Sequence, residues 1–201
     1  IEMVAGDCLQ AEITAKQVAK EQGTVFVSPY NDLDVIAGQG TIGLEIFEDC
    51  PDVDAVFTSV GGGGLISGIG YYLKDNKDTV KMIGCSPENA PALFKCLEAG
   101  KVISVQEQET LSDSTAGEPE PDTITLSLCQ EILDKKYLVS ESVIKQGMRK
   151  VAEMERWIVE GAAGVAVGGF LEHMQDFQNK TVVIVLCGRN ILFERYLQAV
   201  Q

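Results

Sequence analysis

The sequence predicts an α/β protein of three layers, in which helices cover both faces of a mostly parallel sheet. Two observations lead to this prediction. Segments with strand character alternate with segments of helical spacing along most of the 201 residues, as in sheets whose parallel strands are joined by helices. Four consecutive glycines at residues 61–64 also separate a strand-like run from a helix-like run. Such turns lie at the carboxyl ends of strands, where ligands of these sheets collect.

Strands are expected in the short apolar runs that lie between turn residues. They are placed at residues 1–5, 24–28, 54–60, 80–85, 137–139 and 181–186. These runs contain Val, Ile, Phe and Tyr, which favour strands.

Helices are expected between these strands. They are placed at residues 8–22, 40–48, 65–75, 90–99, 123–133 and 161–171, with one more after Ser140 and a last one after residue 190. Asp7 is suited to cap the first helix and Gly23 to end it, with Ile13, Val18 and Ala19 facing inward. Residues 101–123 are polar and without periodicity, so a long loop is expected there.

The glycine turn has a composition that suits an anion. Without side chains, several backbone N–H groups can converge on one phosphate, and the helix that follows adds the positive end of its dipole. The turn at residues 187–190 also follows a strand, so both turns are expected to line one crevice.

The overall composition restricts the partners. A formal net charge of −14, from 30 acidic and 16 basic residues, argues against nucleic acid and against an anionic membrane as partners. The six cysteines show no C-x-x-C pair and no matching histidines, so we expect free thiols in the cytosol and no zinc site. No signal peptide and no membrane-spanning run is found. Because the chain opens on an apolar run at Ile1, we expect it to be part of a longer protein.

Four motifs then point to a family. They are Ala-Gly-Gln-Gly-Thr-Ile-Gly-Leu-Glu at residues 37–45, Gly-Gly-Gly-Gly-Leu at 61–65, Glu-Gly-Ala-Ala-Gly at 160–164 and Leu-Cys-Gly-Arg-Asn at 186–190. Together and in this order they resemble the serine/threonine dehydratases and serine racemases, which are pyridoxal-phosphate (PLP) enzymes of the tryptophan-synthase β-subunit fold. The resemblance implies that residues 1–28 end the small domain and residues 29–201 form the large PLP-binding domain. It also implies a homodimeric parent protein.

The resemblance further implies a set of cofactor contacts. The backbone of the glycine turn corresponds to the family's phosphate cup, and Cys187 stands where a Ser or Cys meets the pyridine nitrogen. Glu160 matches an acidic residue that faces the cofactor, and Asp113-Ser114 matches an Asp-Gly pair beside the ring. The residues implied to contact PLP are Gly61, Gly62, Gly63, Gly64, Leu65, Ser114, Glu160, Cys187 and Asn190.

The chemistry expected at Cys187 follows from its functional group. A neutral thiol cannot stabilise a protonated pyridinium as a carboxylate does, so the cofactor would be a moderate electron sink. Moderate sinks suit β-elimination, in which an amino acid loses its α-proton and its β-hydroxyl and yields a 2-oxo acid and ammonia. Serine and threonine are the family's usual substrates of this kind.

The sequence also departs from the family. The Schiff-base lysine lies in a Ser-x-Lys motif that this chain lacks, so the chain is expected to be inactive alone. Positions that bind a divalent cation in several relatives correspond to Ser86 and Ala92, which are poor ligands for a hard cation. Arg189 replaces a small residue and could crowd the ring.

Each candidate residue also has a purely structural explanation. The glycines could be a flexible turn, Cys187 a buried thiol, Glu160 an acid favoured by a helix N-terminus, and Asp113-Ser114 a solvated turn. The small residues 161–164 are expected to allow close packing. His173 is expected at the surface, and the acidic clusters at residues 107–109 and 118–122 are expected to be solvated.

Four functions remain open at this point. The first is a PLP-dependent ammonia-lyase acting on a small hydroxy-amino acid, and an amino-acid racemase is its alternative within the same family. Another is a non-catalytic fragment or degenerate relative that keeps a phosphate-binding or assembly surface. The weakest is a nucleotide-binding protein, because G-x-G-x-x-G with an acidic residue at the next strand end is not found.

Overall fold

The computed structural model describes residues 1 and 3–201, and its centre is a four-stranded parallel sheet. The strands are β1 (Ala55–Ser59), β2 (Lys81–Pro87), β3 (Lys135–Val139) and β4 (Val182–Ile184), in the order β3-β2-β1-β4. All three neighbouring pairs run parallel. Parallel neighbours require crossover connections, and these carry the helices to the two faces of the sheet. The predicted α/β class is therefore confirmed.

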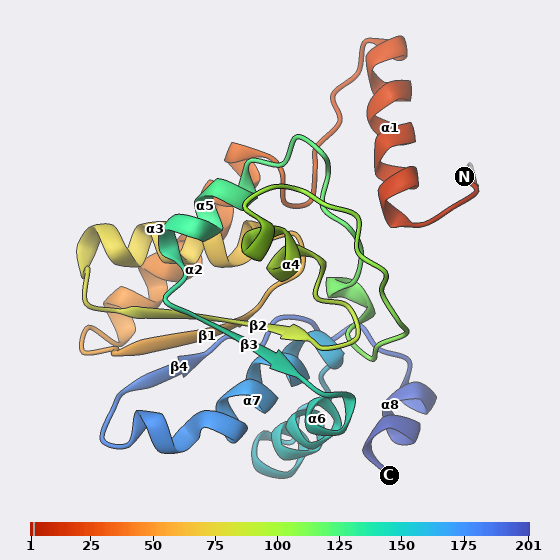
Figure 1. The fold of residues 1–201 in the computed structure, drawn as a ribbon. Coiled ribbons are helices and arrows are strands. Elements are labelled where there is room, and N and C mark those ends of the chain that lie inside the picture. Colours follow the sequence, from red (N-terminus) through yellow and green to blue (C-terminus); the bar gives the residue numbers. More distant parts are fainter. Residues whose placement is uncertain (2) are drawn as a thin grey trace.

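Helices cover the sheet on both sides (Figure 1). One face carries α2 (Leu33–Asp49), α3 (Gly64–Asn76), α4 (Ala92–Ala99) and α5 (Thr125–Ile132). The other face carries α6 (Glu141–Glu155) and α7 (Gly161–His173), with α8 (Phe193–Val200) beside α6. Two short 3-10 helices, η1 (Asp113–Thr115) and η2 (Met174–Phe177), lie in connections. In the part of the chain that is described, no helix combines the length and the apolarity needed to cross a membrane.

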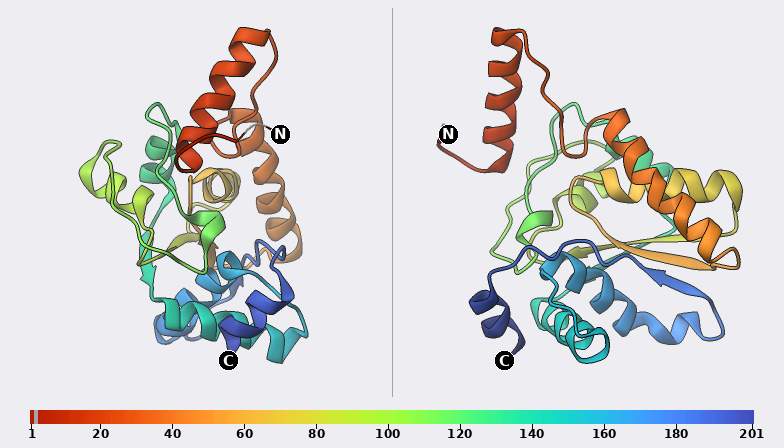
Figure 2. Two further views of the ribbon diagram at one scale, coloured as in Figure 1. Left: turned by 90° about the vertical axis from the view of Figure 1, so that its right-hand side faces the viewer. Right: turned by 180° about the vertical axis from the view of Figure 1, so that it is seen from behind.

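Helix α1 (Cys8–Gln22) stands apart from these layers and projects from the body of the molecule (Figure 2). Its expected caps are confirmed: the Asp7 carboxylate accepts from the Gln10 N–H at 3.0 Å, and Gly23 adopts the left-handed conformation at φ 66°. Ala19 is buried, but Ile13 is 40% exposed and does not face inward as expected, because the projecting helix has few neighbours to pack against.

Alternate residues of β1 enter two separate hydrophobic clusters. Phe57 belongs to the cluster on the α6–α7 side, where its ring packs edge-on against Phe170 and Phe177. Val56 and Val60 belong to the cluster on the α3–α5 side. Side chains of a strand point alternately to opposite faces, so the sheet is covered by apolar groups on both sides and its central strands are fixed.

Small residues bring α6 and α7 close together, as expected for residues 161–164. A Cβ atom on Gly164 would lie 2.8 Å from the Ile144 carbonyl oxygen, and one on Gly161 would overlap the Leu111 backbone. Any side chain at these two positions would therefore push the elements apart. This packing places the N-terminus of α7 directly beside the loop that contains η1.

Two predicted strands are absent. Residues 24–28 have no regular secondary structure, with Val25 87% and Val27 62% exposed, because no strand among the described residues lies beside them. Residues 1 and 3–5 are not in a strand either, while Glu2 lies outside the described residues.

Two helix starts also differ from expectation. Helix α2 begins at Leu33, seven residues before the predicted start, because the Asp32 carboxylate caps it by accepting from the Asp34 and Val35 N–H groups. Ser140 occupies the N-cap position of α6, but its hydroxyl caps no backbone N–H.

Candidate functional site

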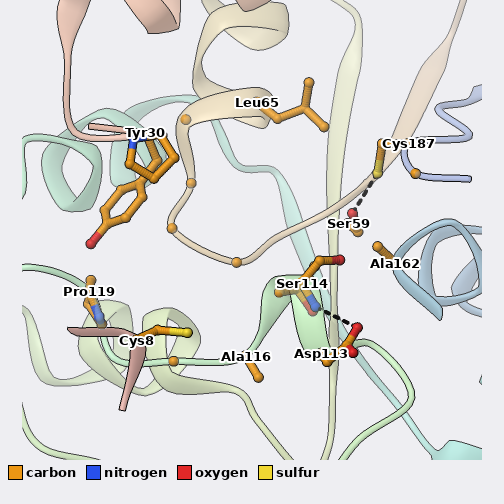
Figure 3. A pocket seen from close by; sticks show the side chains of 18 of the residues that line it. Cys8, Tyr30, Ser59, Leu65, Asp113, Ser114, Ala116, Pro119, Ala162 and Cys187 are labelled. Atoms are coloured by element: carbon orange, nitrogen blue, oxygen red, sulfur yellow. Dashed lines mark hydrogen bonds between the residues drawn. The ribbon is translucent and has the colours of Figure 1, made fainter. Parts of the chain in front are cut away.

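The largest cluster of candidate residues surrounds a cavity of about 390 Å³ at the carboxyl edge of the sheet. The glycine turn after β1, the η1 loop and the turn after β4 all line it (Figure 3). Because β1 and β4 are parallel neighbours, the turns that follow them meet at one edge. The prediction that both turns line one crevice is confirmed.

The glycine turn presents a row of free backbone donors to this cavity. In the described chain, no N–H group from Gly61 to Ile66 donates to a protein acceptor. Gly63 has φ 86°, which a residue with a side chain rarely adopts, and helix α3 starts at the next residue. Converging N–H groups at a helix N-terminus form an anion site, so the turn can hold a phosphate without a cationic side chain.

Close neighbours require that these positions remain glycine. A Cβ atom on Gly61 would lie 2.9 Å from the Thr115 Cα, and one on Gly64 would lie 2.8 Å from the Tyr30 Cα. Both distances are shorter than real Cβ contacts, and the obstacles are backbone atoms. The turn is therefore enclosed by residues 30 and 115, which fix its shape.

Cys187 lies at the end of the cavity nearest to β1. Its Sγ atom is 2.9 Å from the Ser59 Oγ atom (Figure 3). Burial raises the pKa of the Cys187 thiol, and the Ser59 hydroxyl partly opposes this rise. Cys187 therefore enters the site as a neutral thiol at neutral pH.

Glu160 joins the η1 loop to the turn at residues 187–190, which contains Cys187. Its carboxylate accepts from the Ser114 hydroxyl at 2.9 Å and from the Asn190 N–H at 2.8 Å, and its own N–H donates to the Gly188 carbonyl oxygen. Ser114, Glu160 and Cys187 line the cavity together with residues 61–65. Asn190 is exposed and lies outside the lining, so only its backbone is tied to the site.

Arg189 points away from the cavity. Its guanidinium lies 4.9 Å from the centre of the Trp157 ring, a stacking contact that holds the charge outside the lining. The expectation that Arg189 crowds the ring is therefore not met, because Arg189 lies outside the cavity lining. Asp113 lines the cavity, and its carboxylate is paired with Arg195, with 2.6 Å between Asp113 Oδ2 and Arg195 Nη1.

The acidic clusters of the long loop are solvated only in part: Glu109 and Asp122 are exposed as expected, but the other carboxylates are bonded within the chain. The Glu107 carboxylate accepts from the Ala92 and Gly117 N–H groups, and that of Glu118 accepts from the Val105 N–H and the Ser104 hydroxyl. These bonds replace the missing helix or strand bonds of the loop. Carboxylates are the available acceptors in a segment that is rich in Glu, so they hold the loop in place beside the cavity.

Glu120 ties the same loop to α1. It is 3% exposed and accepts from Lys16 Nζ at 2.9 Å and from the Ser28 hydroxyl at 2.8 Å. Its N–H donates to the Tyr30 hydroxyl oxygen at 2.7 Å. The loop, helix α1 and the segment between α1 and α2 therefore meet at one carboxylate.

Ser86, one of the two positions that match the relatives' cation ligands, is bonded within the chain. The Ser86 hydroxyl donates to the Ala90 carbonyl oxygen at 3.4 Å. Across the described residues, no three His, Cys, Asp or Glu side chains form a group that could hold a metal ion. His173, expected at the surface, is half-buried and stacks on Tyr137 at 3.6 Å, away from the cavity.

Fold and cavity together define a parallel α/β protein with a backbone anion site and a neutral thiol in one pocket. The family model described as "Pyridoxal-phosphate dependent enzyme" matches residues 1–188, and the chain belongs to this family.

Several similar proteins support this assignment. The chain is 40% identical over 182 residues to the L-threonine ammonia-lyase of Thermotoga maritima, a match that covers 90% of the chain and 45% of the relative. The processed form of threonine deaminase isoform 2 from Solanum lycopersicum superposes with a TM-score of 0.88 at 30% identity, over 94% of this chain and 56% of that one. Serine racemase from Dictyostelium discoideum superposes with a TM-score of 0.79 at 29% identity, over 90% of this chain and 59% of that one. The chain thus spans about half the length of the relatives it matches.

The residues that line the cavity fit pyridoxal phosphate. A phosphate dianion needs several donors, and the N–H groups of residues 61–66 have no acceptor in the described chain. The carboxylates that line the same cavity are engaged. Glu12 accepts from the Tyr30 hydroxyl at 3.4 Å, Glu160 and Asp113 are bonded as described above, and Glu118 accepts from the loop backbone. At the other end, a thiol can face a neutral heterocyclic nitrogen without the cost of an unpaired charge.

Sequence reasoning missed several residues of the cavity. Ser59, Tyr30 and Thr115 line it and belong to none of the four motifs, and Ala162 lines it from the motif at residues 160–164, where no contact was assigned to it. Ser59 could have been found, because it is the last residue of a strand that ends in a ligand-binding turn. Tyr30 and Thr115 come from loops whose path the sequence does not reveal.

Proposed function

We propose that this chain forms the cofactor-binding part of a PLP-dependent ammonia-lyase, which converts a small hydroxy-amino acid to a 2-oxo acid and ammonia by β-elimination. The observation that carries this proposal is the single cavity that joins a backbone anion site to a neutral thiol. The names of the relatives, L-threonine ammonia-lyase and threonine deaminase, support the same reaction.

In this proposal each candidate residue has a role of its own. The N–H groups of Gly61, Gly62, Gly63, Gly64 and Leu65 hold the phosphate, and the Cys187 thiol faces the ring nitrogen. PLP, when bound, supplies an electron-withdrawing ring that stabilises negative charge on the amino-acid Cα. Opposite a neutral thiol this withdrawal is moderate, which suits loss of a β-hydroxyl.

Ser114 and Glu160 orient the cavity wall beside the ring. The Glu160 carboxylate fixes the Ser114 hydroxyl and the backbone of Asn190, so the η1 loop and the turn after β4 keep their separation. We assign Asn190 to this positioning of the turn, through its N–H.

The division into domains is also proposed. Residues 1–28 are assigned to the small domain and residues 29–201 to the large PLP-binding domain. The projection of α1 from the layered body supports this division (Figure 2), as do the unpaired residues 24–28, whose apolar side chains suit a sheet of their own.

We further propose that the protein is a cytoplasmic homodimer that acts on a free amino acid. An apolar groove over α2 and α3, lined by Leu33, Leu44, Tyr71, Tyr72 and Leu128 among others, supports burial against a second subunit. Six free cysteines support a reducing compartment. Sedimentation equilibrium of the chain would give the dimer mass, and a monomer at all concentrations would contradict the dimer.

Two experiments test the function. Titration calorimetry of the chain should detect weak, non-covalent PLP binding that inorganic phosphate abolishes. A chimera in which this chain replaces the matching segment of the Thermotoga maritima enzyme should release ammonia from L-threonine or L-serine. A chimera that folds and binds PLP but only racemises serine would favour the racemase alternative, and one that folds without binding PLP would favour a non-catalytic module.

A further inference from the structure

Ser59 is a polar side chain of the cavity to which the sequence motifs assign no role. It is the last residue of β1, it is 5% exposed, and its hydroxyl lies within the cavity lining. Among the described residues the one hydrogen-bond partner of this hydroxyl is the Cys187 thiol, at 2.9 Å. When a buried hydroxyl has a single hydrogen-bond partner, that bond fixes the orientation of both groups.

The geometry allows either group to be the donor, and the cavity decides between the two arrangements. A neutral pyridine nitrogen has a lone pair and no hydrogen, so a thiol that faces it must donate its S–H. The sulfur lone pairs then remain for the Ser59 hydroxyl, which has one hydrogen to donate. In the opposite arrangement the S–H would point at Ser59 and the ring nitrogen would face no donor.

We propose that Ser59 is a positioning residue, whose hydroxyl donates to the Cys187 sulfur and so directs the thiol S–H into the cavity. The identity of the ring that receives this S–H rests on the proposed function, whereas the Ser59–Cys187 bond is a property of the chain alone. Ser59 thereby keeps the thiol a donor and the ring nitrogen unprotonated.

The pKa of the Cys187 thiol tests whether the Ser59 hydroxyl donates to the sulfur. A hydroxyl that donates to sulfur stabilises the thiolate, so its removal raises the thiol pKa. A hydroxyl that cannot turn its hydrogen to the sulfur stabilises the neutral thiol alone, so its removal lowers the pKa or leaves it unchanged. A rise therefore shows that the Ser59 hydroxyl donates to the Cys187 sulfur.

The experiment measures the rate of iodoacetamide labelling of Cys187 against pH, read peptide by peptide by mass spectrometry. The thiolate is the reactive form. In Ser59→Ala we expect the pH midpoint to rise by about one unit, or about tenfold slower labelling at a fixed pH below both midpoints. Ser59→Thr, which keeps a hydroxyl, should restore the wild-type midpoint.

A second serine–cysteine pair supplies the control. Ser67 of α3 and Cys129 of α5 form the same kind of contact at 3.5 Å, in the buried core between these two helices. Ser67→Ala should leave the Cys187 midpoint unchanged. A midpoint that falls or stays constant in Ser59→Ala would overturn the proposal, as would an equal rise in Ser67→Ala, since that would reflect loosening of the fold.

Failure of this inference can be told apart from failure of the proposed function. Phosphate and PLP titrations of the unmutated chain test the anion site and do not involve Ser59. If the chain binds neither ligand but the midpoint rises in Ser59→Ala, the function is wrong and the bond direction stands. If both ligands bind and the midpoint does not rise, the role of Ser59 is wrong.

Discussion

The ring of Tyr30 packs directly on Gly62, so closely that a Cβ atom at Gly62 would overlap the ring carbons. The Tyr30 hydroxyl is in turn held by the Glu120 N–H. A residue from the segment between α1 and α2 thus forms one wall of the anion site. The shape of the glycine turn depends on this wall as much as on the glycines.

This contact predicts the effect of a single methyl group. Gly62→Ala should displace Tyr30 or the turn and weaken phosphate binding by about 5- to 150-fold, since overpacking costs about 1–3 kcal/mol. Calorimetric titration with inorganic phosphate measures this. Gly38→Ala is the matched control, because a Cβ there meets nothing within 4 Å. It should leave binding unchanged and stabilise α2 by about 0.5–1 kcal/mol. Equal binding by both variants would contradict the assignment of the turn.

A buried hydroxyl offers a gain in stability. Thr58 is fully buried in β1, and its Oγ1 has no hydrogen-bond partner in the described structure. Such a group loses its bonds to water without replacement, which costs about 1–3 kcal/mol. Thr58→Val, of the same shape, should therefore raise the free energy of unfolding by about 1 kcal/mol in urea titrations. Thr58→Ser, which keeps the hydroxyl and opens a cavity, should lower it.

The Glu120 carboxylate should be important for the attachment of α1. Glu120→Ala removes the partner of Ser28 and Lys16 and should cost about 1–3 kcal/mol. Asp122→Ala is the control. Asp122 contacts the same lysine at 3.3 Å but is 71% exposed, so the change should cost at most about 0.5 kcal/mol. Thermal melts compare the two, and limited proteolysis between α1 and α2 should accelerate only in Glu120→Ala. Equal losses in both variants would contradict a role specific to the buried carboxylate.

Asp134 predicts a pH dependence of stability. Burial tends to raise its pKa, but bonds from Lys74, the Met82 N–H and Lys81 outweigh this and lower the pKa below the ordinary 3.8. A lowered carboxyl pKa stabilises the fold above the unfolded value, and this contribution is lost as the pH falls through the folded value.

Asp134→Asn should therefore cost about 1 kcal/mol at pH 7, discounted for partial exposure. The cost should be constant down to about pH 5 and should shrink below about pH 4, since the wild-type carboxylate is then protonated. Urea titrations at several pH values measure it. Asp78→Asn, an exposed position, should show no such trend, and a cost in Asp134→Asn that does not change with pH would refute the ion-pair explanation.

Local patterns were sufficient for the layered fold. The alternation of strands and helices, the Asp7 and Gly23 caps and the place of the four glycines between a strand and a helix each depend on a few neighbouring residues, and each was confirmed. The predicted strand at residues 24–28 was wrong because strand formation needs a partner, and no neighbouring segment of the described chain provides one. The start of α2 was missed because Asp32 caps the helix from inside a segment that resembles a simple turn.

The sequence alone predicted the class of ligand, whereas the contacts that shape the cavity were visible only in the tertiary structure. The glycine run after a strand predicted a phosphate ligand, and the Cys-Gly-x-Asn turn predicted a heterocycle through its resemblance to the family, because each of these features depends on the residues of a single turn. The approach of Ser59 to Cys187, the packing of Tyr30 on Gly62 and the use of Glu107, Glu118 and Glu120 as internal acceptors join residues that are far apart in the chain. Such contacts depend on the order of the strands and on the path of a loop without periodicity, so only the folded arrangement specifies them.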